Sequence, residues 1–93
     1  MATLMYSFKE RLLFRTIAEE AVVLDLDTGD YYGLDPVATL TWQLLAGGSG
    51  VSEICDAVVQ AFETDPDTAR ADIEAFVAEL SSAGIVQSAE VAR

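Results

Sequence analysis

The stretch that decides the fold is Val22-Val23-Leu24-Asp25-Leu26-Asp27-Thr28-Gly29-Asp30-Tyr31-Tyr32-Gly33-Leu34-Asp35-Pro36. It predicts a β-hairpin that leads directly into a capped helix. The second strand, residues 30–34, is short and aromatic, and no later segment has a pattern suited to pair with it. A free strand edge beside an apolar helix is a surface on which an extended peptide can add as a further strand.

The turn of this hairpin sets which side chains face the core. Alternating apolar residues at 22, 24 and 26 are typical of a half-buried strand. A three-residue loop over 27–29, with Gly29 left-handed, places these positions on the inner face. The expected pairs are Leu26 with Asp30, Leu24 with Tyr32 and Val22 with Leu34. Tyr31 and Gly33 then point outward.

The rest of the chain supplies one more strand and three helices. Residues 12–18 are compatible with a strand, and Asp35-Pro36 opens a helix that runs to about Ala46. A second helix starts near Ser52, and Asp65-Pro66 opens a third that ends at Gly84, after which Ile85-Val86 returns toward the core. The sequence therefore predicts an α+β, winged-helix-like fold with a three-stranded antiparallel sheet followed by three helices. The expected division is a tail at 1–9, a domain at 10–87 and a tail at 88–93.

The charge is strongly acidic, with 16 Asp and Glu against 5 Lys and Arg and a net charge of −11. Such a surface repels phosphate backbones and favours a basic or amphipathic partner. No apolar run reaches the length of about 20 residues that a membrane helix needs, and the start lacks the pattern of a signal peptide. With the single Cys55, this composition indicates a cytoplasmic protein with no nucleic-acid or membrane partner.

The residue types needed for most catalysis are missing. There is no histidine, one cysteine and one lysine, Lys9, so Ser-His and Cys-His systems and the usual metal sites are excluded. Asp25, Asp27 and Asp30 surround a turn, where aspartate makes local hydrogen bonds. The run of glycines at 47–50 follows a helix end and reads as a linker. The sequence predicts a protein that is not an enzyme and has no cofactor or metal.

Three segments, in this order, resemble the PqqD family, which contains coenzyme PQQ synthesis protein D and the precursor-recognition proteins of lasso-peptide pathways, together called RiPP recognition elements. The segments are Leu24 to Pro36, Trp42-Gln43-Leu44-Leu45 and Asp72-Ile73-Glu74-Ala75-Phe76-Val77-Ala78-Glu79-Leu80. The resemblance covers about residues 10–87. One departure is Asp35, where the family commonly has asparagine, and both residues cap helices.

The resemblance implies a module that binds the leader segment of a ribosomally made precursor peptide. The leader would add to the third strand, pack on the third helix and be presented to modifying or leader-cleaving enzymes. Carried onto this chain, the resemblance gives an edge strand, an apolar pocket floor on the third helix and two flanking charges. These expected peptide-binding residues are Asp30, Tyr31, Tyr32, Gly33, Leu34, Ile73, Phe76, Val77, Arg70 and Asp72.

Other interpretations remain beside this one. Ile73 and Phe76 lie at the helical spacing of core residues, and Asp72 also suits the helix dipole. Within the family, a lasso-peptide pathway with a cysteine peptidase is favoured over a PqqD-like pathway with a radical SAM enzyme. An acidic interaction module of unrelated role is the further alternative. A DNA-binding winged helix conflicts with the charge, and an acyl carrier lacks the Asp-Ser-Leu segment for its prosthetic arm.

Overall fold

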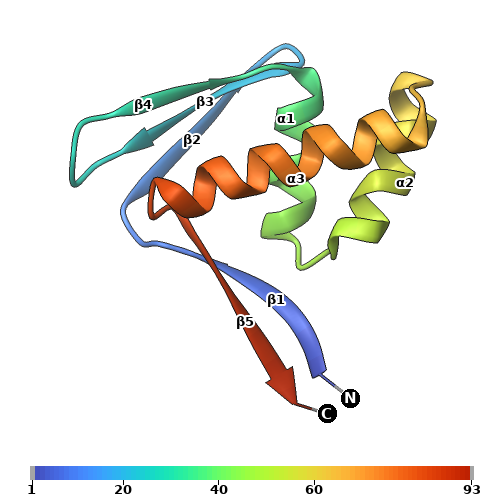
Figure 1. Cartoon of the computed structure of the whole chain (residues 1–93). Coiled ribbons are helices and arrows are strands. Elements are labelled where there is room, and N and C mark those ends of the chain that lie inside the picture. The colour runs from blue at the N-terminus through green and yellow to red at the C-terminus, as the bar shows by residue number, and fades with distance from the viewer. Residues whose placement is uncertain (1, 93) are drawn as a thin grey trace.

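The computed structural model describes residues 2–92 as five strands and three helices (Figure 1). In chain order the elements are β1 (Ala2–Phe8), β2 (Leu12–Ile17), β3 (Glu20–Asp25), β4 (Tyr31–Leu34), α1 (Pro36–Ala46), α2 (Val51–Phe62), α3 (Pro66–Ser82) and β5 (Val86–Ala92). The antiparallel sheet β2-β3-β4 precedes the three helices, so the predicted α+β architecture is confirmed. Within residues 2–92, no helix is long and apolar enough to span a membrane.

The hairpin has a different register from the one the sequence predicted. Val23 lies opposite Tyr32 and Ala21 opposite Leu34, and the Asp25 N–H donates to the Asp30 carbonyl over 2.8 Å. The loop therefore has four residues, 26–29, and not three. Gly29 is left-handed as expected, with φ of 81°. The one-residue shift moves the side chains of β3 to opposite faces.

As a result, the inner face of β3 carries Ala21, Val23 and Asp25, all buried. The prediction that alternate residues from Val22 face the core is wrong, since Val22 is 38% exposed and lies on the outer face. The prediction assumed that the inner-face positions are apolar, but Asp25 occupies one of them. The outer face holds apolar side chains that resemble a core stripe in the sequence.

Asp25 tolerates burial because its carboxylate is fully engaged. Its Oδ2 lies 2.9 Å from Lys9 Nζ, and its Oδ1 accepts the backbone N–H groups of Asp27 at 2.9 Å and Thr28 at 3.4 Å. Hydrogen bonding to Lys9 lowers the pKa of Asp25 against the opposing effect of burial, and the same contact raises the pKa of Lys9. One carboxylate thus fixes both the four-residue loop and the segment that precedes β2.

The helix boundaries follow local signals that the sequence displays. Asp35 and Asp65 accept the N–H groups of Ala38 and Thr68, and a proline follows each cap. At the end of α3, Gly84 has φ of 76°, and the Ile85 N–H bonds to the Leu80 carbonyl over 2.9 Å. This turn buries Ile85 completely, as the predicted return toward the core requires.

A second sheet, formed by β1 and β5, was not foreseen, because the sequence analysis assigned residues 1–9 and 88–93 as tails. The two strands pair antiparallel from Ala2↔Ala92 to Phe8↔Val86 and project as a ribbon from the rest of the molecule (Figure 1). At its inner end Phe8 packs edge-on against Trp42 with ring centroids 4.6 Å apart, and Phe14 of β2 stacks on the same indole. The ribbon is therefore anchored on α1.

Candidate functional site

The free edge of the three-stranded sheet is β4, which pairs with β3 on one side and with no strand of residues 2–92 on the other. Hydrogen-bonded and non-hydrogen-bonded positions alternate along an antiparallel pair. Because Asp30 bonds to Asp25, the backbone groups of Tyr32 and Leu34 are the ones directed at β3. Those of Tyr31 and Gly33 are directed at the open edge, which thus offers two N–H donors and two carbonyl acceptors.

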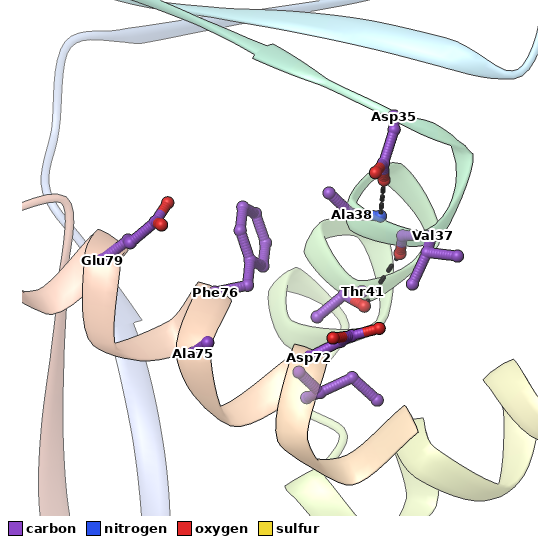
Figure 2. Close-up of a pocket in the computed structure, with 9 residues that line it drawn as sticks. Asp35, Val37, Ala38, Thr41, Asp72, Ala75, Phe76 and Glu79 are labelled. Carbon is purple, nitrogen blue, oxygen red and sulfur yellow. Dashed lines mark hydrogen bonds between the residues drawn. The ribbon is translucent and has the colours of Figure 1, made fainter. Parts of the chain in front are cut away.

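A groove runs along the inner side of this edge, between β4 and α1 on one wall and α3 on the other. It consists of two adjoining hollows of about 360 and 320 Å³. Four residues line both hollows and join them into one surface: Asp35, Ala38, Phe76 and Glu79. Figure 2 shows the Phe76 ring projecting from α3 toward the first turn of α1. The groove therefore connects the free strand edge with the third helix.

The groove has an apolar floor and an acidic rim. Ala38, Ile73 and Phe76 form the floor, and Ile73 also packs into the core at 1% exposure. The rim carries the carboxylates of Asp35, Asp72 and Glu79, and no lysine or arginine lines either hollow. Such a groove suits a peptide segment with apolar side chains and a basic or neutral character.

The α1 side of the groove is held rigidly by its own hydrogen bonds. Asp35 Oδ1 accepts the Ala38 N–H over 2.8 Å, and Thr41 Oγ1 donates to the Val37 carbonyl over 2.8 Å, as the dashed lines in Figure 2 show. Asp35 therefore caps the helix, and it also contributes charge to the rim. Because α1 begins directly after β4, the cap fixes the angle between the strand edge and the helix wall.

The structure brings seven of the ten residues predicted from sequence to the strand edge or the groove. These seven are Tyr31, Tyr32, Gly33, Leu34, Asp72, Ile73 and Phe76. Ile73 lies in the groove floor and also packs in the core. Tyr31 is 75% exposed and points outward, as expected.

Three of the predicted residues lie elsewhere. Val77 is 7% exposed and packs in the core without lining the groove. Arg70 turns toward α2, where its guanidinium lies 3.5 Å from Ser52 Oγ, and it also lies 3.9 Å from Glu74, one turn further along α3. The Asp30 carbonyl is already used by β3, and its side chain is exposed outside the groove.

Sequence reasoning missed eight residues that line the groove: Asp35, Val37, Ala38, Thr41, Ala75, Glu79, Leu80 and Ala83. A signal for two of them was present, since residues 72, 75, 76 and 79 follow the i, i+3, i+4, i+7 spacing of one helical face. From this face the prediction named Asp72 and Phe76 and left out Ala75 and Glu79. Among the described residues, no group of three or more His, Cys, Asp or Glu side chains could hold a metal ion.

Comparison with known proteins agrees with this geometry. The structure of TbiB1 in complex with the TbiA(beta) leader peptide matches with a TM-score of 0.78 and 31% identity, over 86% of this chain and 93% of that one. The structure of lasso peptide synthetase B1 complexed with the leader peptide matches with a TM-score of 0.77 and 24% identity, over 88% and 96% of the two chains. The second likeness shows a shared fold.

The comparison with curated proteins gave no match. The family model for coenzyme PQQ synthesis protein D, PqqD, matches residues 20–86, which extend from the start of β3 to the first residue of β5. This range includes the free strand, the groove and all three helices. The chain belongs to the PqqD family.

Proposed function

We propose that this protein binds the leader segment of a ribosomally made precursor peptide and presents it to the enzymes that modify it or remove the leader. The leader adds as a strand to β4 and packs its inner side chains into the groove against α3. The observation that carries this proposal is a free strand edge with an apolar-floored groove beside it, lined from Tyr32 to Leu34. The role is recognition and not catalysis.

The pathway we favour is lasso-peptide biosynthesis. It is supported by the fold that this chain shares with lasso peptide synthetase B1, which was solved with the leader peptide. The 31% identity to TbiB1, also solved with a leader peptide, supports leader binding itself. In such a pathway the protein would deliver the leader to a separate peptidase. A PqqD-like partnership with a radical SAM enzyme is the alternative, and a cleavage assay separates the two. Faster leader removal by a co-encoded cysteine peptidase in the presence of this protein would support the lasso pathway, and an unchanged rate would contradict it.

The direct test is fluorescence anisotropy with a labelled leader peptide from the short precursor encoded beside this gene. We expect saturable binding that weakens at least about tenfold, or about 1.4 kcal/mol, in Phe76→Ala, because an aromatic side chain at the centre of a groove is a typical binding hot spot. Phe76 also packs against the core, so the melting temperature of the Phe76→Ala variant has to be recorded, to separate weaker binding from loss of the fold.

Two further variants separate binding from folding. Ala75→Arg places a bulky charged side chain in the groove from an exposed position of α3, and we expect it to weaken binding at an unchanged melting temperature. Arg70→Glu is the matched control on the same helix, because its contacts with Ser52 and Glu74 lie outside the groove. Normal leader affinity in both Phe76→Ala and Ala75→Arg would refute the proposed site.

A further inference from the structure

We infer that the outer face of the sheet carries a second leader subsite, centred on Gly33, that takes one aromatic side chain of the bound peptide. This inference rests on the proposed function and adds to it, because the groove against α3 accounts only for side chains on the inner face. A strand directs successive side chains to opposite faces. A leader strand on β4 therefore has alternate side chains that must lie on the outer face.

The outer face is hollowed beside β4. A depression of about 440 Å³ is lined by the outer-face residues Ile17, Glu20, Val22 and Gly33 and, at its ends, by Ala21, Leu34 and Asp35. Val22 lies directly opposite Gly33 in the pairing of β3 with β4. The depression exists because Gly33 has no side chain to cover its neighbour.

Two apolar side chains in this depression are unusually exposed to solvent for a surface that binds nothing. Ile17 is 73% exposed and Val22 is 38% exposed. Both are β-branched side chains that stabilise a sheet best when a cross-strand neighbour covers them. On β2 the residue opposite Val22 is Arg15, and on β4 it is a glycine. The β4 side of Val22 therefore has no side chain of its own and is left open to the next strand along, which is the added leader.

The position of Gly33 also fixes which leader residue supplies the cover. Its N–H and carbonyl point at the open edge, so the leader residue level with it shares its outward face. No atom lies within 4 Å of the place a Gly33 Cβ would occupy. A leader side chain can therefore lie flat across Gly33 onto Val22. Gly33 is one strand spacing from the leader, about 5 Å, and Val22 is two, about 10 Å. Only a long side chain spans β4 and reaches Val22, and aromatic side chains are the ones that shield an edge glycine in this way.

The test fills the depression from the protein side with Gly33→Thr. The backbone at Gly33 is not left-handed and the surrounding space is open, so threonine fits there without strain. Because threonine favours strands more than glycine does, the melting temperature should stay level or rise. We expect the affinity for the labelled leader of the neighbouring precursor to fall at least about tenfold, with Gly33→Ala falling less. A protein that is more stable and yet binds less well is the signature of a filled subsite.

A peptide series completes the test as a double-mutant cycle. Each aromatic leader residue is replaced by alanine and titrated against the natural protein and Gly33→Thr. Replacing one of these aromatic leader residues should lower the affinity for the natural protein about tenfold and the affinity for Gly33→Thr less than about twofold. Leu13→Thr is the matched control, since Leu13 is an exposed outer-face residue of β2 outside the depression, and it should bind normally.

The outcomes separate this inference from the function on which it rests. Normal binding by Gly33→Thr together with weak binding by Phe76→Ala and Ala75→Arg would overturn the outer subsite and leave leader binding in the groove intact. A uniform loss across all leader variants in Gly33→Thr would also overturn the subsite, because it would indicate disturbed strand pairing. Absence of saturable binding to the natural protein would overturn the proposed function and the subsite with it.

Discussion

Replacing single backbone N–H groups of the leader by N–CH₃ tests whether the peptide adds to β4 as a strand. The change leaves side chains and charge untouched and removes one donor at a time. β4 offers its outward acceptors at only two residues, Tyr31 and Gly33, because the carbonyls of Asp30 and Tyr32 are directed at β3. Two leader N–H groups should therefore be sensitive, and they belong to residues separated by one insensitive residue.

The expected magnitude follows from the net value of a hydrogen bond. Losing one such bond costs about 0.5–1.5 kcal/mol, which weakens binding about twofold to thirteenfold. The methyl group also occupies the gap between strands that lie about 4.8 Å apart, so the upper end of this range is expected at both sensitive positions. The residue between them directs its N–H away from the protein and should lose less than about twofold.

The assay is a competition titration of each N-methylated leader against the labelled parent peptide. N-methylation also restricts the free peptide, so the peptide methylated at the residue between the two sensitive positions serves as the reference, because it carries the same restriction without losing a bond to β4. A loss that repeats with a period of two residues supports strand addition. Equal losses at adjacent positions, or no loss anywhere, would refute the placement of the leader along β4.

Three other predictions follow from the structure. Val23→Ala should lower the free energy of unfolding by about 2 kcal/mol, because it removes two fully buried methyl groups. Val22→Ala, on the outer face, should lower it by about 0.5 kcal/mol or less. Equal losses for the two variants in urea denaturation would contradict the observed register. Lys9 lowers the pKa of Asp25 in the folded protein, so the ion pair stabilises the fold fully above about pH 4, and this stabilisation is lost as the pH falls through the folded pKa. The difference in urea midpoint between the natural protein and Asp25→Asn should therefore become smaller in acid. A difference that stays constant with pH would refute the stabilising role of this ion pair. For a leader with net positive charge, stopped-flow association should slow as salt is added while dissociation changes little, since the protein carries a net charge of −11, and a salt-independent association rate would contradict electrostatic attraction.

The parts of the fold that were predicted from the sequence depend on local interactions. Asp35-Pro36 and Asp65-Pro66 start helices through contacts within one turn, and Gly84 ends α3 in the same way. These signals do not depend on distant residues, so they can be recognised in a sequence. The order of elements and the free edge at β4 followed from them.

The parts that were wrong depend on partners far away in the chain. Asp25 is buried only because Lys9, sixteen residues earlier, reaches its carboxylate, and no pattern within the hairpin reveals that contact. The pairing of β1 with β5 joins residues 78 to 90 apart, from Phe8↔Val86 to Ala2↔Ala92, and nothing in either segment identifies the other as its partner. At the candidate site, part of the helical face of α3 was predicted from its residue spacing. The depth of the groove depends on how closely α1 approaches α3, and residue spacing does not determine that distance.

The ribbon of β1 and β5 has a consequence for how the unit can be joined to other chains. Because Ala2 pairs with Ala92, the chain enters and leaves the fold side by side, at the tip of the ribbon that projects away from β4 (Figure 1). A unit with adjacent ends can be inserted into a loop of a larger protein, or closed by a short linker and opened at Gly47–Gly50, without rearranging its interior. A partner fused at the tip of the ribbon would therefore leave the free edge of β4 and the groove beside it accessible.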